Sequence, residues 1–142
     1  MKVTFPHMGT VYVPMKALCQ ELGIELVIPP LNTTRTLSLG VKHAPEGLCI
    51  PFKLTLGNFV EALEMGADTL LQAGGAGICR LGRYAKTQEW VLHDMGYQFD
   101  MIVVGVSDKK LRGLMAMFKT VSNNASWPKL ISALRFAIAK QG

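Results

Sequence analysis

Two cysteines stand out because each comes directly before a predicted helix. Cys49 precedes Ile50-Pro51, and proline is favoured in the first turn of a helix. Cys79 ends a glycine-rich loop, residues 74–79, and a helix is predicted to begin near Arg80. The N-terminus of a helix carries partial positive charge, which stabilises a thiolate. Since the thiolate is the form of cysteine that binds metals and attacks electrophiles, Cys49 and Cys79 are candidate metal ligands or reactive thiols.

The third cysteine has a different pattern around it. Cys19 shares an apolar helical stripe with Met15, Leu18 and Leu22, so we expect it to be buried and free of metal. Three cysteines cannot all pair, and the reducing cytoplasm that we expect as the compartment disfavours structural disulfides. For Cys49 and Cys79, the simpler interpretation as small buried hydrophobic residues stays open.

Glycines and basic residues surround the two candidate ligands. The residues predicted to contact a bound cofactor or anion are Gly74, Gly75, Gly77, Arg80, Arg83 and Lys53. The glycines would let the backbone approach a bulky group and aim its N–H donors at it. The loop does not match a dinucleotide-binding fingerprint, because neither the third glycine nor the later acidic residue is present at the required spacing.

The sequence gives less support to a zinc site or to a hydrolytic active site. Cys49 and Cys79 with His7 and His43 are sufficient donors for a tetrahedral zinc ion, but the spacings typical of zinc sites are absent. We expect His93 to cap the helix predicted between Arg80 and Met95. No paired carboxylates and no Ser-His-Asp set indicate ordinary hydrolytic catalysis.

Apolar strands alternate with amphipathic helical segments through the first 106 residues. Strands are predicted at residues 3–5, 25–28 and 68–73 and within 99–106. This order is typical of an α/β fold with an open, mostly parallel sheet of about four strands and flanking helices, Rossmann-like or flavodoxin-like. Ligands of such sheets bind beyond the carboxyl ends of the strands, and both cysteines are predicted there, on the same side of the domain. The segment from Thr33 to Gly40 is left undecided between a helical turn and a loop.

The chain divides into residues 1–106, a cluster-binding type of α/β domain, and residues 107–142, a basic helical segment. Helices are predicted at 109–121 and 127–140 in the second part, which either packs on the domain or extends from it. An apolar stripe on the last helix, a possible contact surface, consists of Leu130, Ile131, Leu134 and Ile138.

Length, composition and charge argue against a disordered, a membrane-spanning or a nucleic-acid-binding protein. The 142 residues suit one domain, and 49% hydrophobic residues exclude a disordered chain. No apolar run reaches the roughly 18 residues of a membrane span, and no signal peptide is recognisable, so we expect a cytoplasmic protein without a membrane partner. The net charge of +5 is spread along the chain without an aromatic-basic motif, so no nucleic-acid partner is expected.

Four motifs follow one another within residues 1 to about 104. They are Phe5-Pro6-His7-Met8-Gly9, Pro29-Pro30, residues 45–53 (PEGLCIPFK) and residues 74–84 (GGAGICRLGRY). Their order and spacing resemble one branch of the 2-hydroxyacyl-CoA dehydratase and benzoyl-CoA reductase superfamily. The branch contains proteins related to acyl-CoA dehydratase activases, and the double-cubane cluster proteins are its relatives.

The resemblance implies an iron–sulfur protein of anaerobic, low-potential electron transfer or reductive chemistry. Cys49 and Cys79 would ligate the cluster, of [4Fe–4S] type, and an acyl-CoA or another small molecule would be the substrate of a dehydratase or reductase system. Each subunit of the family typically gives three cysteines to its cluster, whereas only two match here. Three explanations stay open: the third ligand lies in sequence outside this chain, another subunit supplies it, or two copies of the chain share one cluster with two cysteines each. We expect another subunit or a second copy to complete the site.

Two alternatives of other classes remain open. In the first, the chain is a metal-free binding or scaffold module that holds a CoA-like anion through Arg80, Arg83 and Lys53. In the second, it is a thiol-redox protein that uses Cys49 and Cys79 as a dithiol.

Overall fold

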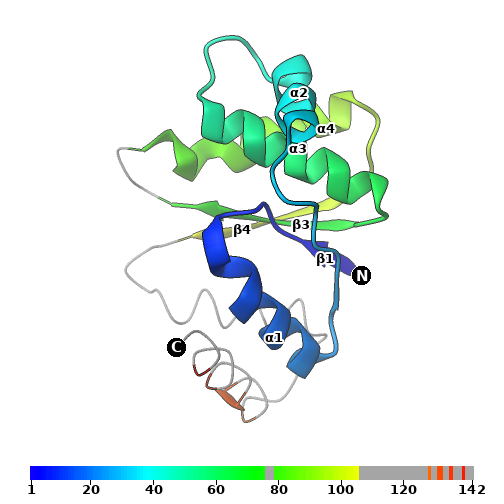
Figure 1. The fold of residues 1–142 in the computed structure, drawn as a ribbon, viewed down its shortest axis with the longest axis vertical. Helices are drawn as coiled ribbons and strands as arrows, with labels where there is room; N and C mark the ends of the chain where they lie inside the picture. The colour runs from blue at the N-terminus through cyan, green and yellow to red at the C-terminus, as the bar shows by residue number, and fades with distance from the viewer. Residues whose placement is uncertain (76–78, 106–127, 129–130, 133–134, 136–138, 140–142) are drawn as a thin grey trace.

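The structure is a computed structural model that describes residues 1–75 and 79–105, together with Pro128, Ile131, Ser132, Arg135 and Ala139. Four strands form one sheet in the order β2-β1-β3-β4, and every neighbouring pair is parallel (Figure 1). The strands are β1 (Lys2–Thr4), β2 (Glu25–Leu26), β3 (Thr69–Gly74) and β4 (Asp100–Gly105). The predicted α/β fold with a parallel sheet is confirmed.

The strand order changes direction between β1 and β3. From β1 the chain adds β2 on one side, and later β3 and β4 on the other side. In open parallel sheets this change of direction opens a space at the carboxyl ends of the two central strands, where ligands bind. Gly75, directly after β3, lies at this end of the sheet, and Cys79 follows four residues later in the chain.

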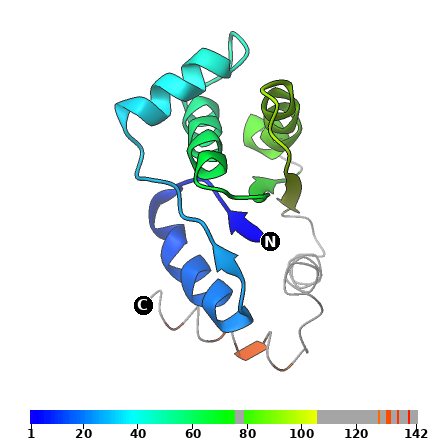
Figure 2. The same ribbon diagram turned by 90° about the vertical axis from the view of Figure 1, so that its right-hand side faces the viewer.

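Helices cover both faces of the sheet (Figures 1 and 2). On one face lies α1 (Tyr12–Leu22), which follows a short 3-10 turn, η1 (Gly9–Val11). The other face carries α2 (Thr34–His43), α3 (Ile50–Glu64) and α4 (Tyr84–Asp94), with the 3-10 turn η2 (Arg80–Arg83) leading into α4. The two layers of helices sandwich the sheet, as the alternation of strands and helices predicts.

Successive residues of β3 supply the two halves of the core. Leu70 packs with the fully buried side chains of Phe52 and Leu92 from α3 and α4. Leu71 points to the opposite face and packs with Val3 of β1. This alternation is the ordinary period of a strand, and each such side chain contributes about 1.5–3 kcal/mol on burial.

The undecided segment is the helix α2, and it packs on α3. The side chain of Thr33 accepts a hydrogen bond from the Thr36 backbone, and the Thr36 side chain accepts one from the Thr33 backbone. This capping box satisfies donors that a helix start leaves free. Gly57 of α3 lies against the backbone carbonyl of Thr36, and Gly40 of α2 lies against the backbone of Lys53. A β-carbon at either position would collide with the backbone of the other helix, so glycine is required at both.

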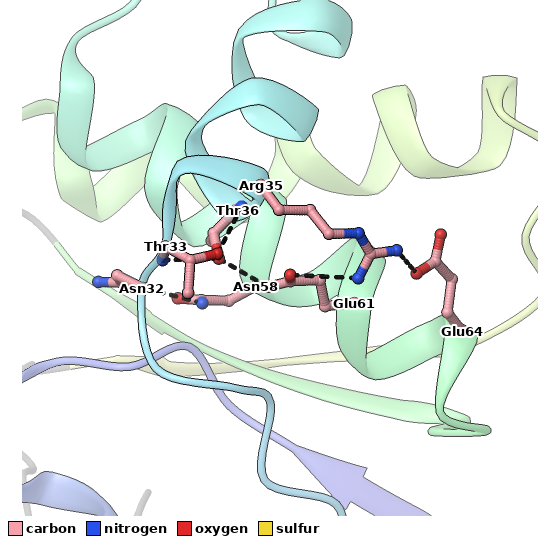
Figure 3. Close-up of polar contacts among 7 residues, drawn as sticks. All are labelled: Asn32, Thr33, Arg35, Thr36, Asn58, Glu61 and Glu64. Carbon is pink, nitrogen blue, oxygen red and sulfur yellow. Dashed lines mark hydrogen bonds and ion pairs between the residues drawn. The ribbon is translucent and has the colours of Figure 1, made fainter.

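Buried polar groups connect α2 to α3 (Figure 3). The Thr36 hydroxyl donates to a carboxylate oxygen of Glu61 at 2.8 Å, and Glu61 is only 3% exposed. Arg35 reaches Glu61 at 3.4 Å and the more exposed Glu64 at 2.7 Å. A carboxylate of this burial is tolerated because it is paired and accepts a hydrogen bond.

Some predicted boundaries differ from the structure. The second strand was expected at residues 25–28 but spans only Glu25–Leu26, and the helix expected from Arg80 begins as a 3-10 turn. The helix predicted at 109–121 and the boundary at 106 lie outside the described residues. Between residues 128 and 139 the described positions are helical, and Ile131 of the predicted stripe is 48% exposed. Among the described helices none is long and apolar enough to cross a membrane.

Candidate functional site

The starts of α3 and α4 lie at the end of the sheet where β3 stops (Figure 1). Cys49 is the residue directly before α3, with extended backbone angles, and Cys79 holds the same place before η2. Both cysteines are exposed. The prediction that each cysteine precedes a helical segment is thus confirmed.

Tyr84, the first residue of α4, connects this helix to Cys49. Its hydroxyl is hydrogen-bonded to the Sγ atom of Cys49. Its ring is buried and packs edge-on against Phe52, with 5.0 Å between the ring centres and an angle of 87° between the planes. When Cys49 is ionised its sulfur carries no proton, so Tyr84 is then the donor of this bond.

The surroundings of Cys49 favour its thiolate. The hydrogen bond from Tyr84 is the largest effect that lowers the pKa of the Cys49 thiol, followed by the backbone N–H of Phe52 in the first turn of α3. The positive charge of Arg80 lowers this pKa further. An exposed thiol with a lowered pKa is available as a nucleophile or as a metal ligand.

Cys79 lies close enough to act on the same tyrosine. Burial raises the pKa of Tyr84 to about 12, and the hydrogen bond and charge of Cys49 and the charge of Cys79 add to the effect. Arg80 acts in the opposite direction. The structure therefore brings Cys49, Cys79, Arg80 and Tyr84 together at the starts of α3 and α4.

Two glycines near Cys79, Gly74 and Gly82, are packed so closely against other parts of the protein that a side chain has no room there. A β-carbon on Gly74 would collide with the side chain of Val103 in β4, and one on Gly82 would collide with the carbonyl of Gly75. Gly75 has a φ of 148°, a region that favours glycine, and its N–H donates to the Gly82 carbonyl at 3.4 Å. Close packing of the end of β3 against β4, and of η2 against Gly75, thus already requires glycine at Gly74 and Gly82. Gly77 lies outside the described residues.

The other predicted cofactor residues border the same region. Arg80 and Arg83 are exposed within η2, directly after Cys79. Lys53 is partly buried in the first turn of α3, and its N–H donates to the Cys49 carbonyl at 3.3 Å. Of these three basic residues, Arg80 is the one whose charge acts on the Cys49 thiol.

The histidines take other roles. His7 follows β1, where its N–H donates to the buried side chain of Asn58 at 3.1 Å and its Nε2 bonds the Pro29 carbonyl at 2.6 Å. His43 is the last residue of α2. In the part of the chain that the structure describes, no three His, Cys, Asp or Glu side chains are grouped to hold a metal ion, so the zinc set considered above is not assembled.

Two expectations outside the site have clear outcomes. Cys19 is 1% exposed on α1, as predicted, and burial raises the pKa of its thiol to about 11. His93 does not cap α4 directly. Its Nδ1 donates to the carbonyl of Tyr97 beyond the helix at 3.1 Å, and its ring stacks on Phe99.

Sequence reasoning missed Tyr84 and Gly82 as parts of the site. Tyr84 fits a buried helical position, and its second role depends on the distance between two helix starts, which helical periodicity does not report. Both residues lie within the motif at 74–84, and this motif was the one available signal.

No protein-family model, no curated protein and no solved structure matches this chain.

Proposed function

We propose that this chain is an iron–sulfur-cluster-binding domain of a low-potential electron-transfer or reductive system. Cys49 and Cys79 supply two thiolate ligands. The observation that carries the proposal is the placement of two exposed thiols at neighbouring helix starts, both acting on Tyr84, with the pKa of Cys49 lowered. The resemblance of four motifs to the dehydratase and reductase superfamily supports the same assignment.

The donor set fits half of a [4Fe–4S] cluster. Thiolate sulfur is the usual protein ligand of such clusters, and four ligands are usual. Two thiols are available here, and no third His, Cys, Asp or Glu joins them among the described residues. We therefore assign the remaining ligands to another subunit or to a second copy of the chain. When bound, the cluster would accept and donate single electrons.

The basic residues and backbone N–H groups of the site would balance the negative charge of the thiolates, the cluster and an anionic substrate. Arg80 and the N-terminal turn of α3 already stabilise the Cys49 thiolate. Arg83, exposed in η2, is the second cation that we assign to an anionic group of a substrate such as an acyl-CoA. Backbone N–H groups of the 74–79 loop are assigned to the sulfides, since hydrogen bonds to sulfur help to set the potential of a cluster.

Anaerobic purification and reconstitution test this proposal. We expect a brown protein that contains iron and acid-labile sulfide in equal amounts, and light scattering should show a dimer or a larger assembly. A colourless protein that retains CoA would instead support a metal-free anion-binding module. A reversible disulfide between Cys49 and Cys79 without iron would support thiol-redox chemistry. A monomer that stably holds four irons would refute the shared site.

A further inference from the structure

Contacts from two successive turns of α4 hold the hydroxyl of Tyr84 in place: the Tyr84 ring packs on Phe52, and Gln88 bonds Thr55. The tyrosine ring is 5% exposed and rests against Phe52, which is completely buried in the first turn of α3. The ring therefore has a fixed orientation, and its hydroxyl is directed at the Cys49 sulfur just outside this turn.

Gln88 holds α4 against α3 one turn further along. Its Nε2 donates to the Thr55 hydroxyl at 2.8 Å, and Thr55 donates to the carbonyls of Pro51 and Phe52 at 2.9 and 3.0 Å. Gln88 is completely buried. Tyr84 and Gln88 are four residues apart, so they lie on one face of α4. Tyr84 contacts Phe52 and Cys49, and Gln88 bonds Thr55, so both residues fix α4 against the start of α3.

Tyr84 is the donor of the hydrogen bond to Cys49 whenever the Cys49 sulfur is a thiolate or is bound to a metal, because the sulfur then has no proton to donate. A neutral donor that faces a thiolate at an exposed position is the arrangement expected of a group that orients a metal ligand.

We propose that Tyr84 is a positioning residue for the metal ligand Cys49. Its hydroxyl fixes the direction of the Cys49 sulfur and withdraws electron density from it through a hydrogen bond. This inference rests on the proposed function, since it assumes that Cys49 binds a metal. Outer partners of metal ligands orient them and tune the potential of the centre, and hydrogen bonds to the sulfurs of a cluster are one such influence.

The variant Tyr84→Phe removes the hydroxyl and keeps the ring against Phe52. Tyr97→Phe is the matched control, because Tyr97 is a partly buried tyrosine at the edge of the same core. In the reconstituted protein, a redox titration followed by electron paramagnetic resonance should show a lower potential for Tyr84→Phe than for the wild type and the control. Equal potentials in all three proteins would overturn the inference.

A second measurement uses Cd²⁺ alone as the probe and does not require a cluster. The affinities of the wild type and the two variants for Cd²⁺ are compared at one pH and one ionic strength. We expect Tyr84→Phe to bind Cd²⁺ at least ~10-fold more weakly than the wild type and Tyr97→Phe, the size of effect that lost outer partners usually have. An affinity unchanged within about twofold would also overturn the inference, because that is below this usual range.

The two measurements separate the possible failures. A wild type that forms no cluster but binds Cd²⁺ with the predicted loss in Tyr84→Phe would contradict the proposed function and leave the role of Tyr84 supported. A wild type that holds a cluster and shows no effect of Tyr84→Phe in either measurement would contradict the role of Tyr84 alone. A wild type that binds neither cluster nor Cd²⁺ contradicts both.

Discussion

Gly57 of α3 lies directly against the backbone carbonyl of Thr36 in α2, so closely that a β-carbon has no room there. Gly40 of α2 makes the corresponding contact with the backbone of Lys53 in α3. α2 and α3 thus touch through their backbones, and the contact of Gly40 with Lys53 lies in the first turn of α3, directly after Cys49.

Replacing Gly57 with alanine should therefore destabilise the protein. In an open helix the change would stabilise by about 1 kcal/mol, but here a backbone must move, which typically costs ~1–3 kcal/mol or more. We expect a net loss of about 2 kcal/mol in urea unfolding. Ser38→Ala, an exposed change in α2, is the control and should stay within about 0.5 kcal/mol of the wild type. A stabilised Gly57→Ala would contradict the close contact.

The two carboxylates that Arg35 contacts, Glu61 and Glu64, should contribute differently to the free energy of unfolding. Glu61 is buried and accepts the Thr36 hydroxyl, so Glu61→Ala leaves that hydroxyl without its partner and should destabilise by about 2 kcal/mol. Glu64 is 40% exposed at its side chain, and Glu64→Ala should change stability by less than about 1 kcal/mol. Equal losses in thermal or urea unfolding would show that the buried hydrogen bond is not the important one.

The parallel sheet and the places of both cysteines follow from the sequence because they depend on local signals. Proline beside Cys49, glycines that end helices and alternating apolar runs all act within a few residues. Gly23 is an example of such a local signal, since it ends α1 in the left-handed conformation with a φ of 69°.

The helix α2 and the role of Tyr84 could not be derived in the same way. The sequence TRTLSLG contains threonines, serine and glycine, which have low helix propensity. The helix forms because Gly40 packs on the backbone of α3 and the Thr36 side chain bonds Glu61 of α3. Tyr84 and Cys49 are 35 residues apart, so their contact depends on the packing of α4 beside α3. Tertiary contacts of this kind leave no periodic pattern in one sequence.

Cys19 should react last of the three cysteines. It is buried, and its pKa is raised to about 11, so at neutral pH it is a protonated and inaccessible thiol. Native protein treated with iodoacetamide should be modified at Cys49 and Cys79, and at Cys19 only after unfolding, as read by mass spectrometry. Cys19→Ala should destabilise by on the order of 1 kcal/mol. Rapid native labelling of Cys19 would contradict its place in the core.

The same raised pKa predicts the pH dependence of stability. Between the ordinary thiol pKa of 9.0 and about 11, the unfolded chain loses the Cys19 proton while the folded chain keeps it. The unfolded state then binds fewer protons, so the free energy of unfolding must fall as the pH rises through this window. Urea titrations should show a smaller decline for Cys19→Ala than for the wild type. Equal slopes in the two proteins would argue against the burial of this thiol.

Cys49 should titrate below an ordinary cysteine. Its thiolate accepts hydrogen bonds from Tyr84 and the Phe52 amide, both of which lower its pKa. Its alkylation rate, followed by peptide mass spectrometry, should therefore reach half of its maximum at a lower pH in the native protein than in urea-unfolded protein. Identical midpoints in the two states would indicate that the tyrosine contact has no influence on the thiol.

The most direct test of the account is the iron content of cysteine variants after anaerobic reconstitution. Cys49→Ser, Cys79→Ser and Cys19→Ala would be compared with the wild type, and circular dichroism would confirm that each is folded. The account predicts that the wild type and Cys19→Ala hold iron and sulfide, and that Cys49→Ser and Cys79→Ser lose nearly all of both. Iron retained at the wild-type level in Cys49→Ser and Cys79→Ser would contradict the assignment of these two cysteines as cluster ligands, and a wild type without iron would contradict a cluster shared by two copies of this chain.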